Sequence, residues 1–305
     1  MAMKFDQFTQ EVVNKIREYL PETFKNAEVE LQTVTKTNDL QLTGLTIRSV
    51  DSNISPTIYL ENFYEKMQQD NEDLNSILSE IAEVRVRHEV SNVFDTDDIM
   101  NWDRVKDRIV PKLINRNWNQ HLLKDRAFAP VSTDLACIYQ ILLSQKFDGN
   151  ASIPITLKLM NTWKTDVETL HELALTNMKR LTPPTFEPMT TVLRSMMGSD
   201  ADDLLADFDE TEEKMFVLSN KSRINGAASI LNDEFMRNIY SKLGDFYILS
   251  SSIHELIIVK NDNNMMSPDE LNSMICEVNE TQVSVDERLS GHAYRWTIEE
   301  GLIPA

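Results

Sequence analysis

The residue types that a hydrolytic site needs occur together in one short stretch, residues 250–255. Ser251 and Ser252 offer hydroxyl nucleophiles, His254 a general base, and Glu255 a carboxylate that could orient it. Known triads, however, draw their members from distant segments, and the chain has no Gly-x-Ser-x-Gly elbow. The stretch is therefore either a hydrolytic site or a polar turn between two strands, and we favour the turn.

A second stretch, residues 220–226, could bind an anion. It reads Asn-Lys-Ser-Arg-Ile-Asn-Gly and lies between a predicted strand and a predicted helix. A helix that begins there would present free N–H groups and a positive dipole end to a phosphate. The stretch lacks the glycine spacing and the Gly-Lys-Ser/Thr order of a P-loop, so a capped basic turn is favoured. The candidate ligand-binding residues are Asn220, Lys221, Ser222, Arg223, Asn225 and Gly226.

The sequence predicts neither a metal nor a cofactor. His171-Glu172 and His254-Glu255 begin like a zinc-protease helix, but leucine and isoleucine stand where the second histidine would be. The five histidines have no ligand spacing, and no Cys-x-x-Cys occurs. Cys137 and Cys276 lie far apart among apolar neighbours, which predicts two buried thiols in a reducing compartment.

The elements that must position these residues begin with an N-terminal part, residues 1–94. Apolar residues at helical spacing predict a helix over 5–20, which Pro21 ends. Alternating patterns over 28–32 and 40–47 predict a hairpin across a polar turn, and 57–60 a third strand. A helix follows, is interrupted near Asp70, and resumes over 74–84. The polar stretch at 95–98 is the candidate boundary.

The larger C-terminal part, residues 105–305, mixes strands and helices without strict alternation. Capping boxes at 165–168 and 267–270 predict two helix starts, and further helices are predicted over 189–197 and 230–243. Pro111 predicts an edge or bulged strand over 109–114, and 135–143 is either a strand or a helix. The remaining predicted strands are 153–159, 215–218, 246–249, 256–259 and 293–297. We predict an α+β fold with mixed sheets and packed helices, in two parts or in one continuous unit.

Charge is the most informative feature of the composition. The chain of 305 residues has 30 Lys and Arg against 49 Asp and Glu, a net charge of −19. That field disfavours direct nucleic-acid and anionic-membrane binding and favours a partner with a basic surface. Residues 200–213 hold eight of the acidic residues with apolar residues between them, which predicts either a solvated segment or a partner-binding one. No apolar run is long enough for a membrane span or a signal peptide, so we expect a cytoplasmic protein.

Several stretches together resemble one uncharacterised bacterial family, a domain of unknown function met mainly in gut Firmicutes and often in accessory or mobile DNA. The stretches are residues 42–48, 53–60, 216–221, 226–228, 246–249, 251–255 and 278–283. The last third also resembles, more distantly, a second uncharacterised cytosolic family of Firmicutes. The resemblance implies a bacterial, intracellular, single-unit protein and brings no activity, cofactor or catalytic residue.

The sequence thus leaves two hypotheses from different classes. The first is a non-enzymatic acidic binding protein, such as an accessory factor of a mobile element or phage, with an inhibitor or nucleic-acid mimic as a specific version. The second is a hydrolase or nucleotide-binding enzyme with a site built from the 220–226 and 250–255 turns. The missing motifs and the negative charge favour the first.

Overall fold

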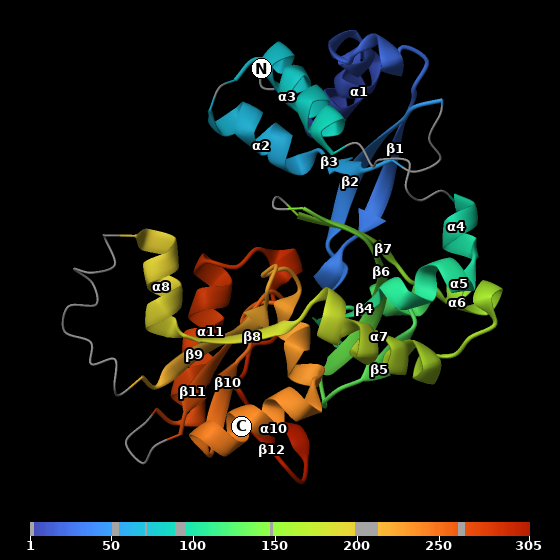
Figure 1. The fold of residues 1–305 in the computed structure, drawn as a ribbon. Helices are drawn as coiled ribbons and strands as arrows, with labels where there is room; N and C mark the ends of the chain where they lie inside the picture. Colours follow the sequence, from blue (N-terminus) through green and yellow to red (C-terminus); the bar gives the residue numbers. More distant parts are fainter. Residues whose placement is uncertain are drawn as a thin grey trace. The chain divides into compact units, whose positions relative to one another are not determined.

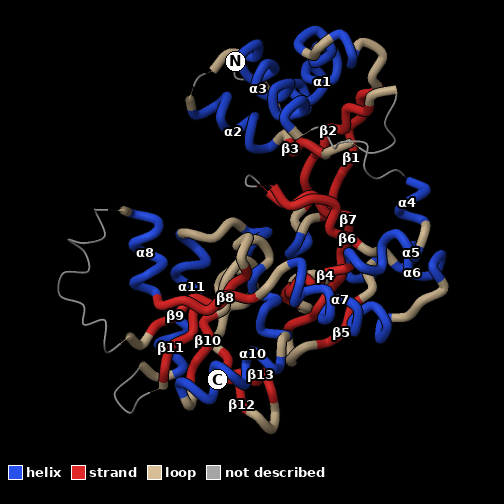
Figure 2. The backbone as a smooth tube through the Cα atoms, in the orientation of Figure 1, coloured by secondary structure: helices blue, strands red, loops and turns tan. Residues whose placement is uncertain are grey.

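The structure, a computed structural model, describes residues 3–50, 55–70, 72–88, 96–146, 149–198, 213–261 and 266–305 (Figures 1 and 2). It divides into two compact units. Unit 1 comprises Met1–Lys36 and Leu40–Asn101, and unit 2 comprises Thr37–Asp39 and Trp102–Ala305. All but one residue of the acidic stretch 200–213 lies outside the described residues.

Unit 1 packs helices against one face of a three-stranded antiparallel sheet of order β1-β2-β3. Alternation along β2 turns Leu45 and Ile47 toward Phe8 of α1 and Ile81 of α3, and this buried cluster is the core. The opposite face carries exposed Glu28. The elements are α1 (Phe5–Lys15), β1 (Glu28–Thr35), β2 (Gln41–Arg48), β3 (Thr57–Tyr59), α2 (Glu61–Gln69), α3 (Leu74–Arg87) and α4 (Thr96–Met100).

The first part of unit 2 is a four-stranded antiparallel sheet with β6 at its centre. Pro111 lies in β4, an edge strand as predicted, and residues 135–143 form a strand rather than a helix. β4 is buried along its length against α7. The elements are α5 (Trp102–Val105), β4 (Ile109–Asn115), β5 (Phe128–Pro130), β6 (Leu135–Lys146), β7 (Gly149–Pro154), α6 (Leu157–Trp163) and α7 (Val167–Leu181).

The second part of unit 2 is a six-stranded antiparallel sheet of order β13-β12-β10-β11-β9-β8, with helices on both faces. Ile248 and Ile258 pack toward Met236 of α10, whereas Leu249 and Val259 pack toward Leu271 of α11. Both faces are apolar because both are covered. The elements are β8 (Pro184–Pro188), α8 (Met189–Met197), β9 (Met215–Asn220), α10 (Asp233–Leu243), β10 (Phe246–Leu249), β11 (Leu256–Lys260), α11 (Pro268–Thr281), β12 (Tyr294–Thr297) and β13 (Gly301–Pro304).

The α+β fold class is confirmed, and several local predictions are wrong. Residues 153–159 are not one strand: β7 ends at Pro154, and the Thr156 side chain caps α6 by accepting from the N–H of Leu159. The helix predicted from Thr165 is capped by Asp166 instead, whose carboxylate accepts from the N–H of Thr169. The strand β13 carried no clear alternation and was not predicted.

The two cysteines differ from each other. Cys137 is fully buried as predicted, and burial raises the pKa of its thiol to about 12. Cys276 is exposed, because it lies on α11 away from the face that holds Leu271 and Ile275 against the sheet. Both thiols are free. No described helix is long and apolar enough to cross a membrane.

Candidate functional site

The two turns that the sequence singled out lie side by side in unit 2. The backbone N–H of Asn225 donates to the Nδ1 atom of His254 over 3.1 Å. The N–H of Ala227 donates to the carbonyl of Ile253, and the Ser219 hydroxyl donates to the carbonyl of His254 over 2.8 Å. All three contacts involve a main-chain group, so the turns hold each other in place.

The 220–226 turn uses its own polar groups to hold its shape. The Asn220 Oδ1 atom accepts from both the N–H and the hydroxyl of Ser222, and its Nδ2 donates to the carbonyl of Ile224. Arg223 and Asn225 adopt positive φ, and the Arg223 guanidinium lies 3.3 Å from the Glu187 carboxylate. A 3₁₀ segment, Gly226–Leu231, follows the turn, and α10 begins at Asp233 with Asn232 as its cap. The helix that begins at this turn is therefore a short 3₁₀ helix, and the α-helix starts seven residues after Gly226.

Gly226 lies where the two turns approach most closely. A Cβ atom there would stand 2.1 Å from Ser219 Oγ and 2.4 Å from the carbonyl oxygen of His254. No side chain fits into this space without a shift of the backbone. Glycine is thus required at position 226 by the contact between the turns, and this explains its place in the stretch.

His254 pairs with a carboxylate that is not its sequence neighbour. Because its Nδ1 accepts a hydrogen bond, the ring carries its proton on Nε2, which faces Glu287 Oε1 at 3.2 Å. The Ser252 hydroxyl accepts from the backbone N–H of His254 and not from the ring. The carbonyl of Ser251 accepts from the N–H of Leu289. The orienting role assigned to Glu255 therefore falls to Glu287.

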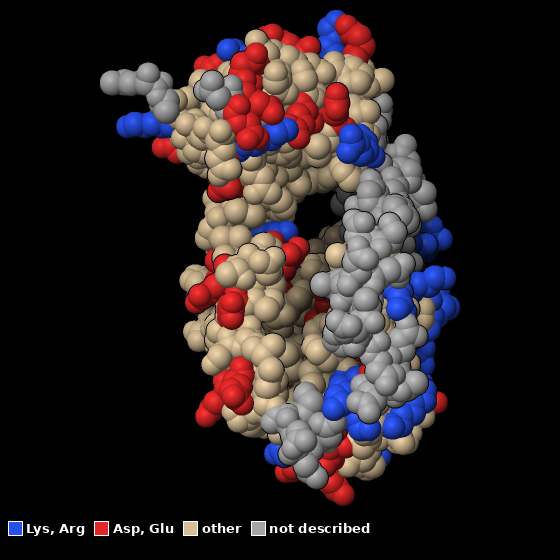
Figure 3. Space-filling model, turned by 90° about the vertical axis from the view of Figure 1, so that its left-hand side faces the viewer, with Lys and Arg blue, Asp and Glu red and all other residues tan. Residues whose placement is uncertain are grey.

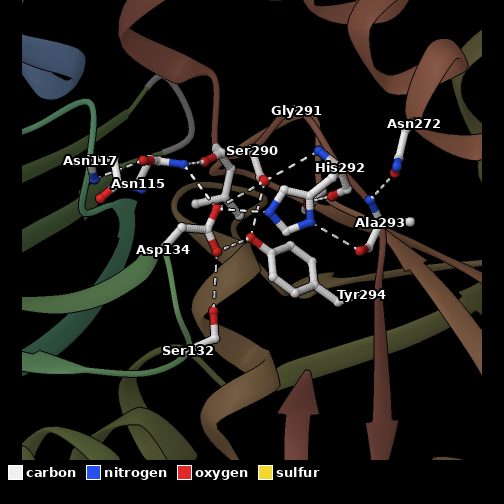
Figure 4. A network of polar contacts seen from close by, with 12 residues as sticks. Asn115, Asn117, Ser132, Asp134, Asn272, Ser290, Gly291, His292, Ala293 and Tyr294 are labelled. Carbon is white, nitrogen blue, oxygen red and sulfur yellow. Dashed lines mark hydrogen bonds and ion pairs between the residues drawn. The ribbon is translucent and has the colours of Figure 1, made fainter. Parts of the chain in front are cut away.

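A second polar centre, which the sequence analysis missed, lies deeper in unit 2 (Figure 4). The Asp134 carboxylate receives the Tyr294 hydroxyl at 2.8 Å, the Nε2 atom of His292 at 3.0 Å and the Ser132 hydroxyl at 3.3 Å. The Tyr294 hydroxyl also lies 3.0 Å from Ser290 Oγ. We call Asp134, Ser290, His292 and Tyr294 the Asp134 cluster. Asn115 lies at its rim and donates to the carbonyl of Leu289.

Both ring nitrogens of His292 face groups that only accept hydrogen bonds. Nε2 faces Asp134, and Nδ1 lies 3.1 Å from the carbonyl oxygen of Ala293. The hydrogen bond to Asp134 raises the pKa of His292 against the effect of burial. Burial acts to raise the pKa of Asp134, but hydrogen bonds from His292 and Tyr294 outweigh it and hold that pKa below its ordinary value. The pair is therefore an imidazolium and a carboxylate.

The hydroxyls of the Asp134 cluster are poorly placed for nucleophilic chemistry. Ser290 and Tyr294 are fully buried, and burial raises the pKa of Tyr294 well above its usual range. Among the described residues, no hydroxyl donates to either ring nitrogen of His292, so the imidazole is not positioned as a base. The cluster instead links the chain around β6 to the chain around β12.

The sequence held one signal that could have revealed part of this cluster. Ser290, His292 and Tyr294 alternate with period two, which places three polar side chains on one side of an extended segment. Asp134 is about 160 residues away in the chain, and nothing in its own neighbourhood marks it as their partner.

The described residues contain no group of three or more His, Cys, Asp or Glu side chains that could hold a metal ion. A cavity of about 10 Å³, the size of one water, lies behind the 220–226 turn. Asn220, Asn225 and Ser229 line it from the turn side, and Pro111 and Met178 from the other side.

Comparison with known proteins gives one match. Residues 5–297 match a family described as a family of unknown function, DUF5688. No curated protein and no solved structure matches the chain. Since the match spans nearly the whole sequence, the chain belongs to DUF5688.

Proposed function

We propose that this DUF5688 member is a cytoplasmic binding protein whose partner presents a basic surface. The observation that carries the proposal is the charge of the chain, 49 acidic against 30 basic side chains. A field of that strength accelerates encounter with a cationic partner and disfavours anionic ones. The two free thiols, one of them exposed, suit a reducing compartment. The family resemblance favours an accessory factor of a mobile element or phage.

The negative charge is concentrated in two parts of the chain. Residues 1–101 hold 19 Asp and Glu against 9 Lys and Arg, and residues 183–305 hold 22 against 9. Residues 102–182 between them hold 8 against 12. A basic partner is therefore expected on unit 1 or near the six-stranded sheet, and not on the four-stranded sheet of unit 2.

On the one face drawn in Figure 3, the carboxylates do not form the band that nucleic-acid mimicry needs. A mimic needs carboxylates in a band at regular spacing, as the phosphates of a duplex are spaced. On the face drawn in Figure 3, Asp and Glu gather in separate patches with Lys and Arg among them. The proposed partner is therefore a protein with a basic surface, without the further condition that the chain imitates a nucleic acid.

The alternative is a hydrolase or nucleotide-binding enzyme built from the 220–226 and 250–255 turns. The hydrogen bond between Asn225 and His254 supports it, because the two turns do lie together. Its weakness is that Asn220, Ser222 and Ser252 are engaged in local hydrogen bonds. A thermal-shift screen with a nucleotide library tests it, since a bound ligand raises the melting temperature.

Affinity capture from a bacterial lysate tests the leading proposal. The full chain is immobilised and washed at about 0.05 M or at about 1 M salt, where the Debye length falls to roughly 3 Å. We expect a small set of proteins with basic surfaces that is retained at low salt and lost at high salt. Retention that does not depend on salt, or captured proteins no more basic than the lysate, would overturn the proposal.

A further inference from the structure

The long edge strand of unit 1, β1, differs from three edge strands of unit 2, β4, β8 and β13. It is the terminal strand of its sheet and pairs with β2 over eight consecutive residues without a bulge. It contains no proline and no lysine. Bulges, prolines and lysines are features by which proteins usually prevent a further strand from pairing with an edge, and β1 has none of them.

Three edge strands of unit 2 carry such protection. β8 begins and ends with Pro184 and Pro188, which lack the N–H that a new neighbour would need. β4 contains Pro111 and is buried under α7, and β13 is four residues long and ends in Pro304. Among these four edges, only β1 is long, pairs without a bulge and contains no proline.

The direction of the backbone groups of β1 follows from one hydrogen bond on its neighbour. The carbonyl of Thr43 accepts from the N–H of Leu60, on the side of β2 that faces β3. The partner of Thr43 across the ladder is Thr33, so this pair does not exchange hydrogen bonds, and the N–H and C=O of Thr33 point away from β2. By alternation, Val29, Leu31 and Thr35 point the same way. No described residue donates to or accepts from these outward groups.

The two faces of β1 specify what could pair with it. Val29 and Leu31 lie on the core face and are only partly buried, so an added strand with apolar side chains would cover them. Glu28, Glu30 and Gln32 lie on the exposed face. Arg48 pairs with Glu28, and Glu30 lies close enough to interact with both of them on the same exposed face. Basic side chains on the added strand would lie across from Glu30.

We propose that the open edge of β1 binds an extended segment of a basic partner as a fourth strand, with basic side chains toward Glu30 and apolar side chains toward Val29 and Leu31. This inference rests on the proposed function, because it names where and how the basic partner binds. A second copy of the chain is the less suitable occupant, since two molecules of net charge −19 repel each other and would bring their glutamates together.

The test uses the full chain and a capped octapeptide of alternating lysine and valine, with a glutamate–valine peptide as the control. Affinity is measured by fluorescence anisotropy at low salt. Amide exchange of β1 is followed by NMR. We expect binding of the lysine peptide alone, with new protection at the amides of Val29, Leu31, Thr33 and Thr35. The amides between them already bond to β2 and change little.

Two substitutions with a matched control locate the site. Glu30→Lys is expected to weaken peptide binding about fivefold, whereas Glu22→Lys, the same charge reversal at an exposed site off the strand, changes it by less than about twofold. Thr33→Pro removes one outward N–H and leaves the ladder to β2 intact, and we expect more than about tenfold weaker binding. If Thr33→Pro unfolds unit 1, the comparison of Glu30→Lys with Glu22→Lys alone tests whether the peptide binds at β1.

Three results would overturn the inference. Salt-dependent binding without protection of the β1 amides would place the peptide elsewhere and leave the proposed function standing. Protection that rises with protein concentration in the absence of peptide would identify a second copy as the occupant. No binding of the lysine peptide would also reject the edge site, while the lysate experiment decides the proposed function separately.

Discussion

Two histidines of unit 2 have similar exposure, with 26% of the His254 side chain and 33% of the His292 side chain accessible, yet they have opposite surroundings. The ring of His292 donates from both nitrogens, to Asp134 and to the Ala293 carbonyl. The ring of His254 accepts from the N–H of Asn225 and donates to Glu287. The first ring lies between two hydrogen-bond acceptors, and the second lies between one donor and one acceptor.

The difference follows from what the backbone offers each ring. At His292, the backbone just before β12 supplies the carbonyl of Ala293, and a carboxylate distant in the chain completes an ion pair. At His254, a tight turn supplies an N–H group, which accommodates only a nitrogen with a lone pair. One centre therefore depends on charge and the other on backbone shape, and substitutions should affect them differently.

The largest effect is expected at the charged centre. Asp134→Ala leaves a partly buried imidazolium without its carboxylate partner and removes one acceptor of the Tyr294 hydroxyl, which should cost about 3 kcal/mol of unfolding free energy. All four tryptophans lie in unit 2, so their fluorescence in a urea titration reports this unit.

The matched control is Asp125→Ala, which removes a surface carboxylate paired with Arg126. We expect it to cost at most about 1 kcal/mol. Equal losses for the two substitutions would mean that the Asp134 cluster contributes no more than a surface ion pair.

The next effect is expected at the centre that depends on shape. Gly226→Ala places a methyl group against the carbonyl oxygen of His254, which belongs to the backbone and cannot move alone. We expect a loss of about 2 kcal/mol, measured by the same urea titration. Gly244→Ala is a control with open space around the position but a positive φ, so it carries backbone strain without steric overlap. A Gly226→Ala loss no larger than the Gly244→Ala loss would argue against the close approach.

The sequence predicted the elements better than the contacts between them. The capping at Ser267, the end of a helix at residue 243 and the apolar strands β10 and β11 depend on local sequence, and all three hold in the structure. The pairings of Asp134 with His292 and of His254 with Glu287 join residues that are remote in the chain or on separate turns. They depend on tertiary packing, which no local pattern encodes. For this reason the sequence suggested Glu255 as the carboxylate partner of His254, whereas the structure places Glu287 there.

A smaller effect, which depends on pH, should distinguish the two histidines further. The folded-state pKa of His292 is raised, so the stabilisation from its charge is complete below the unfolded value and is lost as pH rises through the folded value. The lowered pKa of Asp134 removes the same stabilisation in acid. The free energy of unfolding of the wild type should therefore exceed that of His292→Gln most between about pH 5 and 6. This difference should become smaller as the pH rises toward about 9.

The double-mutant cycle with Asp134→Asn tests that explanation. In the Asp134→Asn background the carboxylate charge is absent, so the pH dependence of the His292→Gln difference should be much weaker. A pH dependence that persists without the carboxylate would locate its origin elsewhere.

The smallest effect is expected at Glu287. Glu287→Gln keeps an oxygen that can accept from Nε2 of His254 and removes only the charge of a carboxylate that is nearly half exposed. We expect a change below about 0.5 kcal/mol, whereas His254→Ala leaves the N–H of Asn225 without its acceptor and should cost about 1 kcal/mol. Urea titrations of both variants give the ranking. If Glu287→Gln proved the more damaging of the two, His254 would have to be held by charge, as His292 is. The difference between the two centres would then lie in their exposure and not in the protonation of their rings.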